Sequence, residues 1–414
     1  MLFSAFRLSA YLFSTCALLT KTTFAAHHTY EVPLYNDLAY QRYNITIALG
    51  TPPQPFSLLF DTGSTDIWVP QPNSSGCAPT CPPSFSFDVT ASSTLTRTHV
   101  PFDARYGLTP DLAVIGEYYN DSLSIAGLPP IANMQFAVGN LPRLLWVQGN
   151  RGIFGLGTRF SESVYASPTS PYRGDLSKTY TPLWERIAFA SRKGERQFSV
   201  WLNAQGKGKG SVQFGGEDRG KYQGELAGVP INLAIEGAVR GWNVNLTGVV
   251  RVGGGEYGKE MRKRLTEESH SVGFTLDTGS PNMYVPTSLY EGIVEGLNAT
   301  EIINGAPYVP CSLRSSATGS LDFEFATRMR GQEARVRVLY SEIIYPPGFP
   351  VTVPPVKDWN GEKMCYFGVV PNDGPVRLLG ATFLRSAYVV FDADEKELRI
   401  AQAKWSDLGE GSEL

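Results

Sequence analysis

The sequence predicts a mostly β chain built from two related lobes, and three observations lead to this fold class. Glycine and proline are abundant, with 42 and 29 residues, which favours many turns and short strands over long helices. Short runs of β-forming residues recur between Gly, Asn and Pro turns through most of the chain. One segment is also repeated about half a chain further on. Two β lobes related by a pseudo-twofold axis are therefore expected.

The composition is that of a soluble globular protein. Of 414 residues, 42% are hydrophobic and 18% are charged, which provides enough apolar side chains for large cores. The length alone suggests two or three domains. The formal net charge is only -3, so neither a nucleic-acid partner nor a membrane surface is indicated.

The first 25 residues have the pattern of an export signal. Arg7 precedes an apolar run from Leu8 to Leu19, and small residues near Ala25 suit cleavage. A membrane anchor is the alternative, but a run of about a dozen residues is shorter than the roughly 20 that span a bilayer. We therefore expect a secreted, extracellular protein with a signal peptide at 1–25, an N-terminal lobe at 26–213, a C-terminal lobe at 214–407 and a polar tail at 408–414.

Four cysteines remain once Cys16 leaves with the signal: Cys77, Cys81, Cys311 and Cys365. Four cysteines allow three pairings, and the spacing favours a small loop closed by the first two and a long loop closed by the last two. Zinc binding is a competing interpretation, because the first two are within metal-ligand spacing. An oxidising compartment favours disulfides, so no metal is expected.

Five N-glycosylation sequons begin at Asn44, Asn73, Asn120, Asn245 and Asn298. Sequons in an exported chain are acceptors for glycans. Because short sequons also arise by chance, the sequence predicts a glycoprotein without assigning the occupied positions.

The repeat centres on two Asp-Thr-Gly-Ser segments. One copy runs from Ser57 to Pro70 and the other from Gly273 to Pro286, and each has an apolar run before the aspartate and aromatic-Val-Pro after it. A single copy is roughly a one-in-a-hundred event in a chain of this length, and it would suit an ordinary turn after a strand. Two copies in matched surroundings are not plausibly accidental. Asp61 and Asp277 are therefore the candidate catalytic carboxylates.

Six further loop residues are candidates for supporting these carboxylates: Thr62, Gly63, Ser64, Thr278, Gly279 and Ser280. The glycines let the backbone turn and approach closely where a side chain would clash. The threonine hydroxyls could bond across the join between the two copies. The serine hydroxyls could donate to the carboxylate oxygens and hold each aspartate in plane.

Two carboxylates that face each other closely cannot both ionise, so the pair shares a proton over a broad acidic range. One carboxylate, as base, deprotonates a bridging water, and the other, as acid, protonates a substrate carbonyl oxygen. Amide cleavage then needs neither a covalent enzyme intermediate nor a cofactor. Because such a pair titrates as a unit, the sequence assigns no fixed role to either aspartate.

Segments around the repeat resemble the pepsin-like aspartic peptidases, from about Tyr40 to Ala403. Tyr43 to Pro53 is similar to the strand and Gly-Thr-Pro turn before the family's first aspartate, and Gly152 to Gly157 and Leu378 to Asp392 look like the segments that buttress the two loops. The last of these resembles fungal members most closely. The resemblance implies a bilobal acid-protease fold with a cleft between the lobes, and a monomeric endopeptidase that acts on protein or peptide substrates at acidic pH. This family is the standard example of the proton-sharing pair.

The resemblance also implies a β-hairpin flap with a tyrosine near its tip. Tyr106-Gly107 is the matching pair, and Trp68 is the expected hydrogen-bond partner of the tyrosine hydroxyl; the alternative is an ordinary aromatic residue in a turn. Leu108 to Ile115 departs from the usual short Gly/Ser-rich tip and looks a few residues longer, with Pro110 to stiffen it.

Two further departures and one alternative function accompany the resemblance. Ala381 stands where the family commonly has Asp, which we expect to affect stability more than chemistry. About 35 residues separate the expected signal cleavage from Asp61, so either the chain is active without removal of a prosegment or an upstream segment is missing from the sequence. A catalytically silent binding or inhibitor protein on the same fold is the alternative function, although both aspartates are retained.

Two other segments carry local expectations. A helix is expected from Leu183 to Ala190, after a Ser/Pro/Thr-rich loop. The charged stretch from Lys259 to His270 is expected to be a solvated helix or loop rather than a binding patch.

Overall fold

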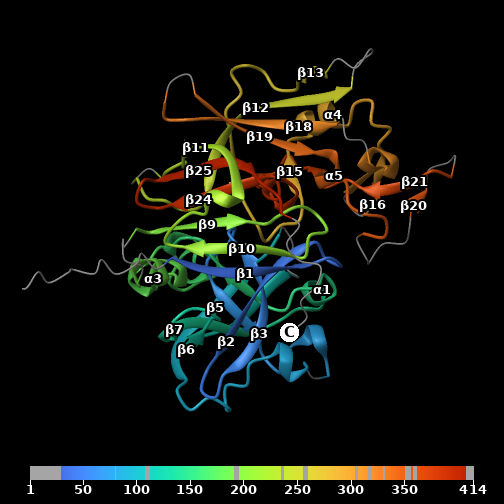
Figure 1. Cartoon of the computed structure of the whole chain (residues 1–414). Helices are drawn as coiled ribbons and strands as arrows, with labels where there is room; N and C mark the ends of the chain where they lie inside the picture. Colours follow the sequence, from blue (N-terminus) through green and yellow to red (C-terminus); the bar gives the residue numbers. More distant parts are fainter. Residues whose placement is uncertain are drawn as a thin grey trace, which may run out of the picture.

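The computed structural model describes residues 29–79, 81–107, 112–190, 195–234, 237–254, 260–303, 306–315, 319–329, 332–349, 356–357 and 361–406. The expected signal peptide (1–25), the tail (408–414) and positions 108–111 of the expected flap lie outside these residues. Strands dominate the described chain, and short helices lie around them (Figure 1). No helix within the described ranges has the length and apolar character needed to cross a membrane.

The largest sheet of the described chain has 13 strands and joins both ends of the sequence, in the order β11-β25-β24-β9-β10-β1-β2-β3-β8-β4-β7-β6-β5. Ten of its strands lie between Tyr30 and Phe214: β1 (Tyr30–Asp37), β2 (Arg42–Leu49), β3 (Gln54–Asp61), β4 (Ile67–Pro70), β5 (Thr96–Arg105), β6 (Ala113–Ser124), β7 (Ile131–Asn140), β8 (Ile153–Gly155), β9 (Gln197–Trp201) and β10 (Lys209–Phe214). The other three are β11 (Tyr222–Pro230), β24 (Ala387–Asp392) and β25 (Glu397–Ala403). Figure 1 shows β24, β9, β10 and β1 between an upper and a lower part of the molecule.

The remaining strands form two smaller sheets in the C-terminal half. An eight-stranded sheet contains β12 (Asn243–Gly254), β13 (Glu260–Arg264), β14 (Val272–Leu276), β15 (Met283–Val285), β18 (Ser320–Ala326), β19 (Glu333–Leu339), β22 (Val369–Pro371) and β23 (Leu378–Leu379). A four-stranded sheet contains β16 (Thr300–Ile303), β17 (Ala306–Pro310), β20 (Val356–Lys357) and β21 (Lys363–Tyr366). The α-helices of the described residues are α1 (Arg143–Val147), α2 (Ser163–Ala166), α3 (Leu183–Ala190), α4 (Thr287–Val294), α5 (Tyr340–Ile343) and α6 (Ala381–Leu384).

The two halves repeat one strand arrangement. In the first half, β3 pairs in parallel with β8, β8 pairs antiparallel with β4, and β4 pairs in parallel with β7. In the second half, β14, β23, β15 and β22 make the same succession of parallel, antiparallel and parallel pairs. The mostly β, bilobal fold expected from the sequence is confirmed.

One hydrophobic core continues through both halves. The ring of Phe198 on β9 stacks on that of Phe391 on β24, with centroids 4.7 Å apart, and Trp242 lies against both rings. Burial of a phenylalanine side chain contributes about 1.5–3 kcal/mol before entropy costs. The expected lobe boundary at 213/214 falls within β10 (Lys209–Phe214), and it stays a prediction.

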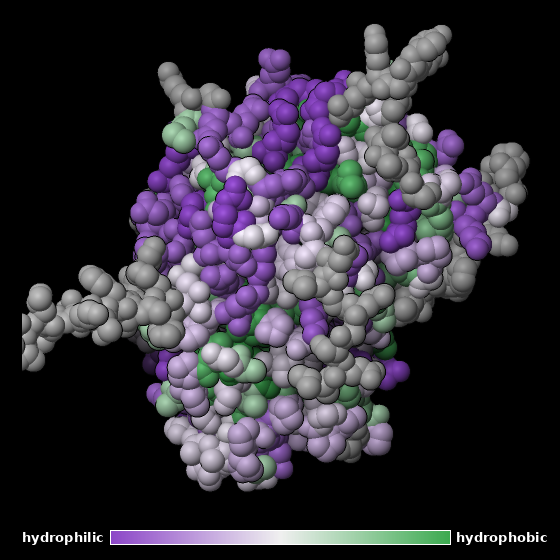
Figure 2. Space-filling model, viewed as in Figure 1, coloured by the Kyte–Doolittle hydropathy of each residue, from purple (hydrophilic) through white to green (hydrophobic). Residues whose placement is uncertain are grey.

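Of the two local predictions, the helix is confirmed and the charged stretch is only partly as expected. The predicted helix from Leu183 to Ala190 is α3, with the expected bounds. The prediction for Lys259 to His270 was wrong in part, because β13 (Glu260–Arg264) is a strand paired with β12. Two arginines of β13 form ion pairs with the buried carboxylates of Asp322 and Glu324 on β18. Figure 2 shows hydrophilic side chains gathered over this upper part of the molecule.

Candidate active site

Asp61 and Asp277 occupy equivalent ends of equivalent strands. Asp61 is the last residue of β3, and Asp277 directly follows β14. Each carboxylate accepts a hydrogen bond from a backbone N–H of its own loop, Asp61 from Gly63 at 2.8 Å and Asp277 from Gly279 at 2.9 Å. Both turns therefore hold the aspartate in the same way.

The two loops approach each other through their glycines. A Cβ on Gly63 would lie 2.6 Å from Asp277 Cγ, and a Cβ on Gly279 would lie 2.4 Å from Asp61 Oδ1. Real Cβ atoms do not approach other atoms so closely, so each glycine is required by the carboxylate of the opposite loop. The sequence segments that are 216 residues apart thus bring their carboxyl groups into one site.

The two threonines connect the loops beneath the carboxylates. Thr62 Oγ1 donates to the Leu276 carbonyl at 2.7 Å, and Thr278 Oγ1 donates to the Phe60 carbonyl at 2.8 Å. Each hydroxyl also accepts from the backbone N–H of the other threonine, at 3.0 Å in both directions. Both side chains are buried. The cross-join bonding expected from the sequence is thus present as a closed set of four hydrogen bonds.

The two serines differ. Ser64 Oγ donates to Asp61 Oδ2, as expected. Ser280 Oγ instead donates to the Asn282 carbonyl at 3.1 Å. The prediction that it donates to Asp277 was therefore wrong. The second loop has Pro281 after the serine where the first has Thr65. The fixed φ of proline turns this backbone differently.

Burial and the neighbouring Asp61 shift the pKa of the Asp277 carboxyl. Loss of hydration and the negative charge of Asp61 raise the pKa of the Asp277 carboxyl well above its usual range. Hydrogen bonds from the Gly279 and Ser280 backbone lower that pKa by less. The pair is therefore arranged to keep a proton at acidic pH.

The segments expected to buttress the loops lie directly against them. Gly155 on β8 pairs with Asp61, and a Cβ there would lie 2.3 Å from the Thr65 backbone. Gly380, its counterpart in the second half, would place a Cβ 2.1 Å from the Asn282 carbonyl oxygen. Ala381, the departure from the family pattern, is fully buried at the start of α6.

Tyr106 and Trp68 form the hydrogen bond expected for the flap. Trp68 Nε1 donates to Tyr106 Oη at 2.6 Å, and the two rings lie 6.2 Å apart. Burial and the charges of Asp66 and Asp61 raise the pKa of Tyr106, which keeps its hydroxyl protonated. Gly107 follows with φ +69°, in the region that favours glycine.

Sequence reasoning missed a buried acidic pair behind the first loop. Asp66 accepts hydrogen bonds from the Tyr118 hydroxyl at 2.7 Å, the Tyr180 hydroxyl at 3.0 Å and the Ser163 backbone at 2.7 Å. Glu162 is also fully buried. Loss of hydration and the charge of Asp66 raise the pKa of Glu162 to about 10. One signal was visible, since Asp66 lies at the position that Asn282 takes in the second copy of the repeat.

Comparison with known proteins identifies the relationship that this geometry indicates. The model of the eukaryotic aspartyl protease family matches residues 42–403, which includes both aspartate loops and nearly all the described strands. The chain belongs to this family. The enzyme class expected from the sequence, an aspartic-type endopeptidase, is confirmed with it.

Several curated relatives of this protease are fungal. A probable aspartic-type endopeptidase opsB of Aspergillus fumigatus is 30% identical over 375 residues, which cover 89% of this chain and 70% of that protein. The aspartic proteinase yapsin-3 of Saccharomyces cerevisiae is 27% identical, over 90% of this chain and 68% of its own length. Candidapepsin of Candida tropicalis is 26% identical, over 90% and 82% respectively. The similarity to fungal members is thus confirmed.

The cysteines of the protease pair as the spacing favoured. Cys77 bonds to Cys81, and Cys311 bonds to Cys365. The sequon asparagines lie on separate elements. Asn44 is on β2, Asn120 is on β6 and Asn245 is on β12. Asn73 and Asn298 are in loops.

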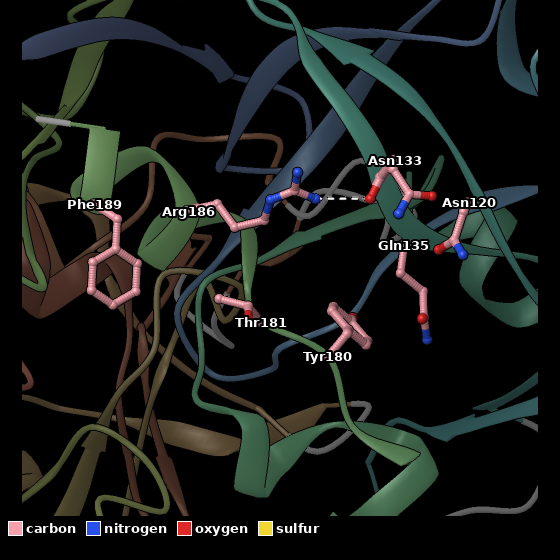
Figure 3. A pocket seen from close by; sticks show the side chains of 7 residues that line it. All are labelled: Asn120, Asn133, Gln135, Tyr180, Thr181, Arg186 and Phe189. Atoms are coloured by element: carbon pink, nitrogen blue, oxygen red, sulfur yellow. Dashed lines mark hydrogen bonds between the residues drawn. The ribbon is translucent and has the colours of Figure 1, made fainter. Parts of the chain in front are cut away.

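A cavity of about 530 Å³ lies on another part of the protease, beside β6, β7 and α3 (Figure 3). Arg186 forms one wall and donates to the Asn133 carbonyl at 2.9 Å. Asn120, Gln135 and Phe189 also line this cavity. None of its lining residues belongs to an aspartate loop, so the candidate active site is defined by the reciprocal contacts of the loops and not by this cavity.

Proposed function

We propose that this protease is a secreted endopeptidase that hydrolyses peptide bonds of extended protein substrates at acidic pH, using a water activated between Asp61 and Asp277. The observation that carries the proposal is the reciprocal approach of the two loops, in which Gly63 and Gly279 each face the opposite carboxylate. Such an approach suits one water held by both carboxyls.

Burial and the charge of Asp61 raise the pKa of Asp277, so the pair keeps one shared proton. One carboxylate, as base, takes a proton from the water, and the other, as acid, protonates the carbonyl oxygen of the scissile peptide bond. Collapse of the resulting diol breaks the C–N bond, as the carboxyl that took the water proton passes it to the leaving nitrogen and the other carboxylate takes back a proton from a diol hydroxyl. Thr62, Thr278 and Ser64 support this geometry through the hydrogen bonds described above.

Tyr106, Gly107 and Trp68 are proposed to belong to a flap that closes over the bound peptide. The Trp68–Tyr106 hydrogen bond would hold the tyrosine ring toward the aspartates, whose charge already reaches it. Secretion, a monomeric state and glycosylation at some of the five sequons are parts of the same proposal, and the two disulfides suit an oxidising compartment.

The test is cleavage of a denatured protein substrate from pH 3 to pH 7, with and without pepstatin, for the wild type and Asp277→Asn. We expect acid-range cleavage that pepstatin blocks and that the variant lacks by at least about a thousandfold, since the pair acts as a unit. A folded but inert wild type would refute the proposal and favour a silent binding or inhibitor protein on the same fold. Full activity of Asp277→Asn would refute the assigned mechanism.

A further inference from the structure

Arg42 lies directly beside the aspartate site. It is the first residue of β2, which pairs antiparallel with β3 in a register that sets Asn44 opposite Leu59. The pairing ends there, and Arg42 and Asp61 each lie two residues beyond that last pair on their own strands. Directly opposed residues and alternate residues of a strand project on the same face of a sheet, so Arg42 and Asp61 project on the face that the Asn44–Leu59 pair shares.

The hydrogen-bonding capacity of Arg42 is largely unused. Nη1 donates to the Gln148 carbonyl at 3.0 Å. Nε is buried and has no acceptor, and no described residue accepts from Nη2 or places a carboxylate oxygen within 4.0 Å of this guanidinium. Arg337 and Arg385, by contrast, bind carboxylates directly.

The acidic groups nearest to Arg42 are already engaged. Asp37, its cross-strand neighbour on β1, accepts from the backbone N–H groups of Ala39 and Tyr40. Asp61 accepts from Gly63 and Ser64. Loss of hydration lowers the pKa of Arg42, while the fields of Asp37, Asp61, Tyr284 and Tyr345 raise it, and an arginine remains charged under all these conditions.

We infer that Arg42 binds an acidic side chain of the substrate, so that the protease prefers peptides with Asp or Glu close to the cleaved bond. The inference rests on the proposed function, because it concerns the substrate of the same site. Nη2, from which no described residue accepts, is the N–H group proposed to bind the carboxylate in a charge-assisted hydrogen bond, since Nε is buried. A basic side chain at the same place would be repelled, and a neutral amide would leave the charge uncompensated.

The experiment compares pairs of peptides that differ only by Glu or Gln at one position, scanned over four positions on each side of a cleaved bond. At pH 5 the wild type should cleave one Glu peptide about tenfold to a hundredfold faster in kcat/KM than its Gln partner, as expected for a charge-assisted hydrogen bond. The preference should shrink toward pH 3, where a glutamic acid of ordinary pKa near 4.3 takes up its proton.

Arg42→Gln should abolish this preference while it still cleaves the Gln peptides. Arg173→Gln is the matched control, because it removes the same charge from an exposed arginine and should keep the wild-type preference. Thermal unfolding of both variants establishes that they are folded.

Three outcomes would overturn the inference or its basis. Equal cleavage of Glu and Gln peptides by the wild type at every position overturns it, as does a preference that survives in Arg42→Gln. A uniform loss of rate on both peptides would assign Arg42 to positioning of the site and also overturn it. All these results leave the endopeptidase proposal intact, whereas failure of the wild type to cleave any peptide would refute that proposal itself.

Discussion

Gly63 and Gly279 show how narrowly single residues are constrained at this site. Each lies where a Cβ would be within 2.6 Å or less of the carboxyl group of the opposite loop. A methyl group there has to push apart two loops that four threonine hydrogen bonds hold together. The methyl group would therefore increase the distance between the two carboxylates, and proton sharing depends on that distance.

At this scale we predict that Gly279→Ala lowers kcat/KM by at least about a hundredfold, because a displacement near 1 Å at a reacting centre costs that much. Gly241→Ala is the control, since a Cβ at Gly241 meets no atom within 4 Å, and its stability should change by less than about 0.5 kcal/mol. Kinetics on one peptide and urea unfolding measure both. Wild-type activity of Gly279→Ala would contradict the close approach of the loops.

Among the elements, the segment that leads from the first aspartate loop into β4 rests on a buried acidic network. Asp66 binds the hydroxyls of Tyr118 on β6 and Tyr180 before α3, and the N–H of Ser163 at the start of α2. Glu162 accepts from the Tyr180 backbone at 3.1 Å, and its Oε1 has no partner among the described residues. Burial raises the pKa of Asp66 as well. Burial thus favours the protonated form of both carboxyls, although the hydrogen bonds donated to Asp66 act in the other direction.

We predict that Glu162→Gln stabilises the protease at pH 7 relative to pH 4. With a folded pKa raised to about 10 from an ordinary 4.5, the carboxyl contributes its full stability below about pH 4.5. That contribution is lost as pH rises toward the folded pKa, at about 1.4 kcal/mol per unit. Glutamine avoids the loss, so its advantage should grow by about 2–3 kcal/mol between pH 4 and pH 7.

Urea unfolding at the two pH values measures this difference. Glu268→Gln, at an exposed position, serves as the control and should show no such growth. An equal effect of Glu162→Gln at both pH values would mean that Glu162 is already ionised in the folded protein.

For the whole molecule, two sets of carboxyls act in opposite directions on stability. Burial and like charge raise the pKa of a first set, which loses stability as pH rises above about 4: Asp66, Glu162 and Asp277. Arginine or lysine partners lower the pKa of a second set, which loses stability as pH falls below about 4: Glu117, Glu295 and Asp322. Because both halves share one sheet and one hydrophobic core, both sets of carboxyls affect the stability of the same folded unit.

We predict that the thermal midpoint is highest at about pH 4–5 and falls on both sides, because the two sets begin to titrate in opposite directions near their ordinary pKa values. Calorimetry from pH 2 to pH 8 would measure the curve. A midpoint that rises steadily to pH 8 would contradict the assignment of the buried carboxyls as protonated in the folded protein.

The aspartate loops, the fold class and the disulfide pairing could be predicted because each leaves a pattern of residue types and spacings in the sequence. Asp-Thr-Gly-Ser stands twice in matched surroundings, and α3 follows a clear loop-to-helix change. The bond of Ser280 and the strand β13 could not be predicted. Ser280 depends on the turn that Pro281 imposes, and β13 depends on carboxylates of β18 that are about 60 residues away in sequence.

By itself the sequence determined which residues form the two loops and why glycine, threonine and aspartate are needed there, because those requirements follow from backbone freedom and hydrogen-bonding capacity within a few positions. Only the tertiary structure decided the partners. It brings Gly63 to Asp277, brings Tyr118 and Tyr180 to Asp66, and sets the register of β2 against β3. Such contacts join distant segments through strand pairing and burial, and no local pattern records which distant residue will be opposite.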